Sequence, residues 1–204
     1  MIVIIDYGMG NIGSILNMMK KIAAKATISS QIVEIEQADK LILPGVGSFD
    51  NGMKNIQERG LIPVLNKKVL EDKTPILGIC LGCQLITKSS EEGTLPGFGW
   101  VEARTIRFNF RDNSDNLKIP HMGWNMARPS KSDPLTDSLE GEQRYYFVHS
   151  FHLMCDHEED VLMKTFYGFE FASAVRKDNV VGVQFHPEKS HKFGMNLLRN
   201  WVGL

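Results

Sequence analysis

The stretch ILGICLGCQLI, which runs from Ile76 to Ile86, joins an apolar run to a turn with a cysteine between two glycines. The apolar residues suit a buried strand, and those after Cys80 suit the start of a helix. Gly78 and Gly82 stand two residues on either side of Cys80, which is the G-x-nucleophile-x-G pattern of a sharp strand-to-helix turn. We expect glycine to be needed on both flanks, because a side chain there would crowd the turn.

The second cysteine of the stretch, Cys83, leaves other interpretations open. A redox pair needs two accessible thiols at a helix start, and a zinc half-site needs two further ligands. Four potential ligands lie close together further along the chain: His149, His152, Cys155 and His157. That segment alternates like a strand, which divides its side chains between two faces, so we expect no metal site. From the pattern alone, Cys80 is either a nucleophile or a buried cysteine beside a tight turn, and Cys83 is a packing residue.

The arrangement of apolar runs along the chain predicts an α/β fold. Up to about residue 90, the expected strands 2–5, 40–47 and 74–80 alternate with expected helices at 15–25, 48–73 (broken near Gly60 and Pro63) and 81–90. This favours a mainly parallel central sheet flanked by helices. The second half adds strand-like segments at 100–108, 144–154, 161–168, 171–177 and 180–186, and then a helix at 192–202. We expect one domain over residues 1–204, with an antiparallel strand region in its second half.

Composition narrows the classes of function. The chain has 204 residues, a formal net charge of −1 and three cysteines, which are too few for a disulfide scaffold. The near-zero charge indicates neither nucleic acid nor an anionic membrane as partner. No apolar stretch approaches the ~20 residues that span a bilayer, and the first residues resemble a strand more than a signal peptide. We expect a cytoplasmic enzyme or binding protein without a cofactor.

A base for the thiol is indicated by VGVQFHPEKS, residues 181–190. A nucleophilic cysteine usually needs a histidine, and the histidine needs a group that orients it. His186 and Glu188 are separated only by Pro187, and residues two apart in an extended chain point the same way. Glu188 is therefore placed to fix the ring of His186. The alternative is an ordinary strand end with a surface histidine and glutamate.

Acyl transfer also needs donors for a developing oxyanion. The amide of Leu81, directly after Cys80, is one natural donor. A second could come from Pro44-Gly45-Val46-Gly47, which follows an expected strand and so lies at the same edge of the sheet. By itself, this segment could equally be a plain turn.

Three blocks in this order, PGVGSF (44–49), GICLGCQL (78–85) and GVQFHPEKS (182–190), resemble the class I (triad) glutamine amidotransferases. KIPHMGWN (118–125) and YYFVHS (145–150) narrow the resemblance to the glutaminase subunits of imidazole glycerol phosphate synthases, the HisH type. The resemblance runs from Asp6 to the last expected helix. It implies the class I glutamine amidotransferase fold.

The resemblance also implies a reaction. Cys80 would attack the side-chain carboxamide of glutamine, and His186, oriented by Glu188, would take the thiol proton and deliver it to departing ammonia. A γ-glutamyl thioester would form, and water would then release glutamate. The resemblance places the oxyanion near the amides of Val46 and Leu81. It assigns the polar ends of the substrate to three residues: Gly47, Gln84 and Glu92.

A partner follows from the same resemblance, because free ammonia is quickly protonated in water. The family docks on a (β/α)8-barrel cyclase of the HisF type, forming a heterodimer. The cyclase uses the ammonia to convert PRFAR, an aminoimidazole-carboxamide ribonucleotide precursor, to imidazole glycerol phosphate and AICAR. Five residues match the stretches that the family places at this interface: Asn11, His121, Trp124, Tyr146 and Lys189.

Other functions remain to be weighed. Related paralogues feed ammonia through a cyclase-like partner to a sugar amidotransferase of surface polysaccharide synthesis. A non-catalytic binding module could keep the fold, but the intact Cys80, His186 and Glu188 argue against it. A cysteine peptidase or chaperone-like relative would lack the HPE and PHMGWN blocks.

Overall fold

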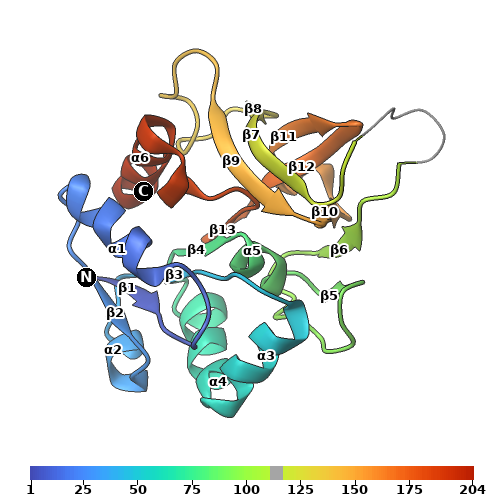
Figure 1. Cartoon of the computed structure of the whole chain (residues 1–204). Helices are drawn as coiled ribbons and strands as arrows, with labels where there is room; N and C mark the ends of the chain where they lie inside the picture. The colour runs from blue at the N-terminus through green and yellow to red at the C-terminus, as the bar shows by residue number, and fades with distance from the viewer. Residues whose placement is uncertain (111–116) are drawn as a thin grey trace.

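The computed structural model describes residues 1–110 and 117–204. Strands and helices alternate through the first half, and strands dominate the second (Figure 1). The strands are β1 (Ile2–Ile5), β2 (Ala26–Ser29), β3 (Lys40–Leu43), β4 (Ile76–Ile79), β5 (Ser89–Ser90), β6 (Ala103–Arg107), β7 (His121–Met126), β8 (Arg128–Pro129), β9 (Arg144–His149), β10 (Phe151–Cys155), β11 (Val161–Tyr167), β12 (Phe169–Lys177) and β13 (Val180–Val183). The α-helices are α1 (Ile12–Lys21), α2 (Ile32–Glu36), α3 (Phe49–Glu58), α4 (Leu61–Asn66), α5 (Leu81–Leu85) and α6 (His191–Gly203). Single turns of π- or 3-10 helix cover Lys67–Glu71, Glu158–Asp160 and Pro187–Lys189.

One large sheet joins both halves of the described chain. Its order is β2-β1-β3-β4-β13-β12-β10-β6-β5. Outside this order, β11 pairs with β12, and β8 pairs with β11. The strands from β2 to β13 pair in parallel, and those from β13 through β12 and β10 to β6 pair antiparallel. The predicted mainly parallel sheet with an antiparallel region is therefore confirmed.

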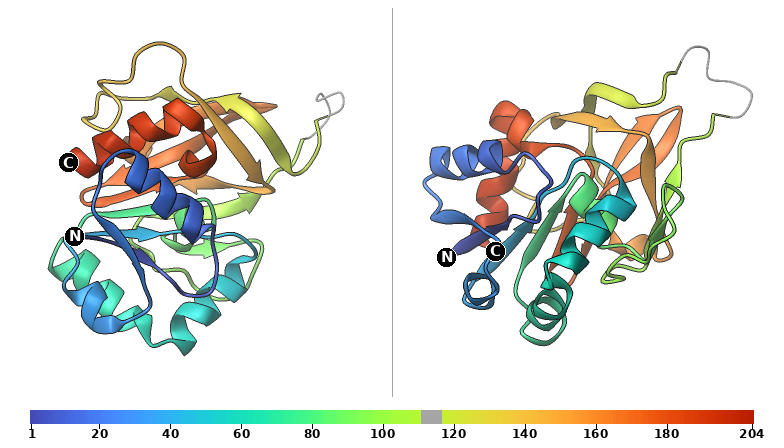
Figure 2. Two further views of the ribbon diagram at one scale, coloured as in Figure 1. Left: turned by 60° about the vertical axis from the view of Figure 1, so that its left-hand side comes forward. Right: turned by 60° about the horizontal axis from the view of Figure 1, so that its bottom comes forward.

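Both faces of the parallel region are buried, because helices cover each of them. Val3 and Ile5 of β1 belong to the apolar cluster beneath α2, α3 and α4, and Ile2 and Ile4 belong to the cluster beneath α1 and α6. In the two views of Figure 2, α1 and α6 lie on one side of the sheet and the other helices on the opposite side. This explains why the strand sequences are continuous apolar runs without alternation.

A second, two-stranded sheet stands over the carboxyl ends of the parallel strands. It consists of β7 and β9, which pair antiparallel from His121 opposite His149 to Met126 opposite Arg144. Residue His186, beyond the end of β13, forms an isolated bridge with Tyr146 of β9, and its amide donates to the Tyr146 carbonyl at 2.9 Å. The small sheet is thereby attached at the edge where the cysteine turn lies.

Two predicted elements differ from the structure. The helix expected over 81–90 ends at Leu85, because the Thr87 amide and hydroxyl both donate to the Gln84 carbonyl and close a turn there. The strand expected over 144–154 is two strands: β9 pairs with β7, whereas β10 pairs with β6 and β12. They separate at Ser150, which lies between them.

Candidate active site

Cys80 occupies the turn between β4 and α5, and its backbone is in a left-handed conformation with φ of +54°. A Cβ at Gly82 would lie 1.8 Å from the Leu43 carbonyl oxygen, and one at Gly78 would lie 2.7 Å from the Gly82 carbonyl oxygen. The prediction that glycine is needed on both flanks of the cysteine is therefore confirmed. Such a turn holds the side chain of Cys80 out of the helix, toward the end of the sheet.

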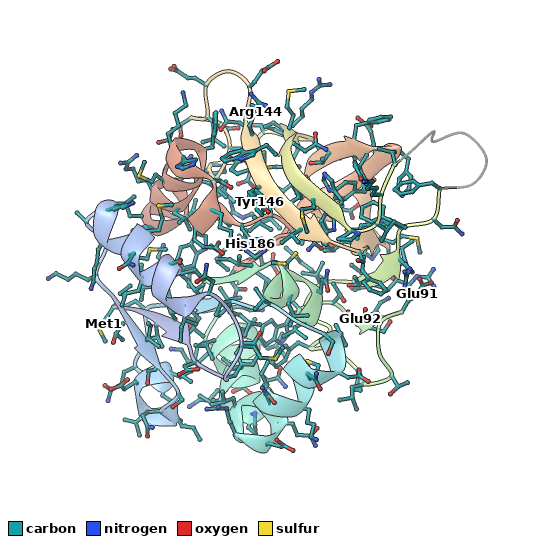
Figure 3. All side chains as sticks on the ribbon, viewed as in Figure 1. Met1, Glu91, Glu92, Arg144, Tyr146 and His186 are labelled. Atoms are coloured by element: carbon teal, nitrogen blue, oxygen red, sulfur yellow. The ribbon has the colours of Figure 1, made fainter. Side chains whose placement is uncertain are left out.

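The register of the sheet brings the HPE segment to the same place. β13 pairs with β4 so that Val183 lies opposite Ile79, and the Cys80 amide donates to the Val183 carbonyl at 2.8 Å. The chain continues from there through Gln184 to His186, between the main sheet and β9. Figure 3 shows His186 near the centre of the molecule, below Tyr146.

His186 and Glu188 form a buried pair. Nδ1 of His186 lies 2.7 Å from a carboxylate oxygen of Glu188, and both side chains are 1% exposed. Among the described residues, Nε2 of the ring is buried without a close hydrogen-bond partner. Burial alone lowers the pKa of His186, but the neighbouring Cys80 and Glu188 outweigh burial and raise the pKa to about 10. The raised pKa favours the imidazolium form of the ring, which can stabilise a thiolate beside it and later act as an acid.

A cavity of about 320 Å³ opens in front of Cys80 and His186, which both line it. This volume suits a small-molecule ligand. All five residues predicted to bind substrate line the same cavity: Val46, Gly47, Leu81, Gln84 and Glu92. Its opposite wall is formed by Pro120 and by residues 148–151, which connect β9 to β10.

Glu92 connects the cavity to helix α3. Its carboxylate accepts a hydrogen bond of 2.8 Å from the amide of Phe49, the first residue of the helix. Figure 3 labels Glu92 on the chain that follows β5. An anion at this position is favourable at a helix N-terminus and is also suited to an ammonium group entering the cavity.

The two predicted oxyanion donors do not face the cavity together. The Leu81 amide points to the Gly45 carbonyl oxygen at 3.4 Å, a long hydrogen bond. In a trans peptide the carbonyl and the following N–H point in opposite directions, so the Val46 amide is turned away from Leu81. Rotation of the Gly45–Val46 peptide would exchange the carbonyl for the N–H. Gly45 packs tightly against Tyr7, since a Cβ at this position would lie 2.6 Å from the Tyr7 hydroxyl.

Sequence analysis missed three side chains around Cys80 and His186. Tyr7 donates from its hydroxyl to the Pro44 carbonyl, and both burial and the neighbouring Cys80 raise its pKa. Ser190 connects the HPE turn to β9 by donating to the His186 carbonyl and accepting from the Tyr146 amide. Gln184 approaches the Cys80 sulfur. None of them carries a motif of its own, and only the spacing of Gln184 two residues before His186 could have indicated that it shares a face with the histidine.

Four of the five predicted interface residues lie at the surface or partly buried beneath it. Trp124 is 42% exposed and stacks on His191, and Lys189 lies over the ring of Tyr146. Asn11 precedes α1, which packs against the Pro187–Lys189 turn. His121 differs, because its side chain is buried and its Nδ1 faces Nε2 of His149 at 2.9 Å. His121 therefore sits behind this surface rather than on it.

The remaining cysteines have a different chemistry from Cys80. Cys83 is fully buried, and burial raises its thiol pKa well above the usual range. Burial also raises the pKa of Cys155, to about 12.

Over residues 1–110 and 117–204, no three His, Cys, Asp or Glu side chains gather closely enough to hold a metal ion. Within the same ranges, no helix combines the length and apolar character that crossing a membrane requires.

Comparison with known proteins agrees with the geometry. The family described as glutamine amidotransferase class-I matches residues 3–203. The chain is 56% identical over 202 residues to imidazole glycerol phosphate synthase subunit HisH 2 of Methanococcus maripaludis, covering 99% of this chain and 98% of the relative. It is 49% identical to the subunit HisH 2 of Pseudomonas aeruginosa over the full length of both.

Solved structures show the same fold at lower identity. A glutamine amidotransferase crystal structure aligns with a TM-score of 0.76 at 21% identity over 99% of both chains. The PurLQS structure from Thermotoga maritima aligns with a TM-score of 0.71 at 18% identity, covering 99% of this chain and 97% of the other. The family match and the near full-length relatives show that this chain belongs to the class I glutamine amidotransferases.

Proposed function

We propose that the chain is the glutaminase subunit of an imidazole glycerol phosphate synthase and works in the cytoplasm as one domain. In this function it hydrolyses L-glutamine to glutamate and ammonia. It passes the ammonia to a (β/α)8-barrel cyclase of the HisF type, which converts PRFAR to imidazole glycerol phosphate and AICAR. The observation that carries the proposal is the cavity that Cys80 and His186 line together with all five predicted substrate residues.

The roles of the three catalytic residues follow from their positions. Cys80 attacks the amide carbon of glutamine as a thiolate, which His186 stabilises as an imidazolium. The imidazolium then gives its proton to the departing ammonia, and the neutral ring takes a proton from the water that hydrolyses the thioester. Glu188, at 2.7 Å from Nδ1, keeps the ring oriented through both steps.

Substrate placement follows from the cavity walls. Glu92 is the anion that faces the α-ammonium group of glutamine, and Gln84 and Gly47 hold its other polar ends. The amides of Leu81 and Val46 receive the oxyanion after the Gly45–Val46 peptide rotates. Because that peptide must rotate first, we expect low activity in the isolated chain and activation by a partner that favours the rotated form.

The partner surface is built around Trp124, Tyr146 and Lys189, with Asn11 beside them. Aromatic side chains are enriched in the core of protein interfaces, and the ring of Trp124 meets that of Tyr146 edge to face at this surface. His121 supports this surface from behind. The names of the two relatives assign them to the synthase, which favours a cyclase as occupant.

The proposal is tested by mixing the chain with a HisF-type cyclase, glutamine and PRFAR, and measuring imidazole glycerol phosphate. We expect imidazole glycerol phosphate and glutamate to form in equal amounts. The control replaces the chain with its Cys80→Ala variant, which should give no product from glutamine, whereas an ammonium salt should restore it. Glutamate release without imidazole glycerol phosphate, when the ammonium salt does yield product, would show that the ammonia goes elsewhere.

A further inference from the structure

The side chain of Gln184 lies against the reactive sulfur, and the proposed mechanism does not use it. Its Nε2 donates toward Cys80 Sγ at 3.9 Å, and its Oε1 accepts from Nε2 of Gln84 at 3.1 Å. Gln184 is completely buried and is not among the residues that line the cavity, so it faces the sulfur from behind.

The sheet fixes this contact. Val183 lies opposite Ile79 in the β13–β4 ladder, and the Cys80 amide continues the ladder to the Val183 carbonyl. The next residue of each strand is therefore Gln184 beside Cys80. Gln184 itself is anchored on its other side, since its amide donates to the Ser173 carbonyl at 2.9 Å.

We propose that Gln184 is a positioning residue for the nucleophile: its side-chain amide, held in place by Gln84, donates to the Cys80 sulfur, stabilises the thiolate and fixes its direction. A donor to a charged acceptor in a buried site is stronger than one between neutral groups. Unlike His186, an amide neither gains nor loses a proton, so this donor is present throughout the reaction. The chain Gln84–Gln184–Cys80 also links a cavity wall to the sulfur.

The proposal rests on Cys80 as the nucleophile of the proposed function, but it can be tested on the thiol alone. The readout is the rate of alkylation of Cys80 by iodoacetamide between pH 5 and 9, measured by mass spectrometry of the peptide that contains Cys80. Neither glutamine nor a cyclase is needed. Failure to make imidazole glycerol phosphate would therefore leave this test unaffected.

Gln184→Met removes the donor and keeps the length of an unbranched side chain. We expect the pH midpoint of alkylation to rise by about one unit, so that the rate well below the midpoint falls about tenfold. The matched control is Ser173→Ala, because Ser173 is equally buried and its hydroxyl has no hydrogen-bond partner among the described residues. The control should keep the wild-type profile. An unchanged midpoint in Gln184→Met, or an equal shift in Ser173→Ala, would overturn the proposal.

A second measurement uses the wild-type chain, so that it does not depend on how the variant folds. The side-chain amide protons of Gln184 should shift in NMR spectra with the same pH midpoint as the alkylation of Cys80. The shift should be lost in Cys80→Ser, whose hydroxyl does not ionise in this range. Gln184 protons that do not respond to pH in the wild type would contradict a hydrogen bond to the sulfur.

Discussion

At the scale of single residues, the turn at Cys80 determines the chemistry. The backbone of Cys80, with φ of +54°, and the glycines at 78 and 82 hold this side chain in the lining of the cavity, which His186 also lines. The two other cysteines lack this setting, and burial raises the pKa of both. Of the three thiols, Cys80 is therefore the one that we propose as the nucleophile.

Cys80→Ala removes the nucleophile and keeps the backbone. We expect glutamine hydrolysis to fall by at least about 10³-fold, because the remaining groups cannot form the thioester. Glutamate release measures the loss, and binding to the cyclase should be unchanged, since Cys80 is buried in the cavity. Wild-type hydrolysis in this variant would refute the assignment of the nucleophile.

Cys83→Ala tests the alternative of paired cysteines. Cys83 packs so closely on the backbone that a Cβ at Gly182 would lie 2.7 Å from its sulfur. Removing the sulfur should reduce the free energy of unfolding by about 1 kcal/mol through lost packing, and it should leave hydrolysis unchanged. Urea unfolding and glutamate release measure the two effects. If the Cys83→Ala variant folds but loses most of its glutamine hydrolysis, Cys80 and Cys83 would again have to be interpreted as a functional pair.

At the scale of elements, helix α3 and the cavity share one carboxylate. Glu92 accepts from the first amide of α3, and it also lines the cavity. Glu92→Gln keeps an acceptor but removes the charge that the helix N-terminus and an ammonium group both favour. We expect the free energy of unfolding to fall by about 0.3–1 kcal/mol and KM for glutamine to rise, with a smaller change in kcat.

The neighbouring Glu91 offers a matched control for this prediction. Its carboxylate accepts from the Arg107 amide at 2.8 Å, at the edge of the main sheet and outside the lining of the cavity. Glu91→Gln should leave KM unchanged. Equal KM values in the Glu91→Gln and Glu92→Gln variants would remove Glu92 from the substrate site.

The strands that the sequence marks most directly are those with continuous apolar runs. Strands β1, β3, β4 and β13 are buried on both faces, so their composition alone identifies them. β2 and α2 were missed because each has only four or five residues, with polar residues among the apolar ones. β7 is not among the expected strands, and its pairing with β9 is what makes it one.

The site could be predicted as far as its motifs reach. Cys80, His186 and Glu188 belong to patterns whose chemistry depends on their spacing, and the residues around them match a family. Gln184, Tyr7 and Ser190 act only through contacts between distant segments, such as Gln184 on Gln84, one hundred positions away. Single neutral polar residues just beyond a strand or a turn carry no signal until the contacts between distant segments are known.

At the scale of the whole molecule, a pair of buried histidines, His121 of β7 and His149 of β9, links the two strands of the small sheet, and His149 also lines the cavity. His149 donates from Nδ1 to the Phe151 carbonyl at 2.7 Å, so its Nε2 accepts from Nδ1 of His121. Burial lowers the pKa of His121 to about 4. Burial, together with His121, His152 and His186, lowers the pKa of His149 to about 3, against the hydrogen bond to Phe151.

These pKa shifts predict a loss of stability in acid. The unfolded chain takes up protons on both histidines near pH 6.5, whereas the folded chain does so only near pH 4 and 3. The contribution to stability is therefore present above about pH 6.5 and is lost as the pH falls, by up to about 1.4 kcal/mol per unit for each histidine. Urea unfolding between pH 4 and 7.5 measures the slope.

His121→Phe tests the assignment, because Phe147 and Tyr167 already stack on the ring of His121. In this variant, the free energy of unfolding should fall less steeply as the pH is lowered, because only His149 of the pair still contributes to the slope. The same slope in wild type and His121→Phe would mean that other groups cause the sensitivity to acid.

Activation by a partner is a property of the whole assembly, and it depends on one peptide unit. Cys80 and His186 already line the same cavity, but the Gly45 carbonyl faces the Leu81 amide, where we propose that the oxyanion forms. One oxyanion donor is typically worth about 10²–10³ in rate. We expect the isolated chain to hydrolyse glutamine slowly and a cyclase with bound PRFAR to raise the rate by about this factor.

Alkylation of Cys80 distinguishes the cause of this activation. If the partner acts by turning the Gly45–Val46 peptide, it supplies a donor for the oxyanion and leaves the thiolate as it was. Iodoacetamide reacts at the sulfur without forming an oxyanion, so its rate should not rise with the partner while glutamate release does. A parallel rise of both rates would show that the partner changes the thiol or its access, and that the peptide beside Val46 does not limit the reaction.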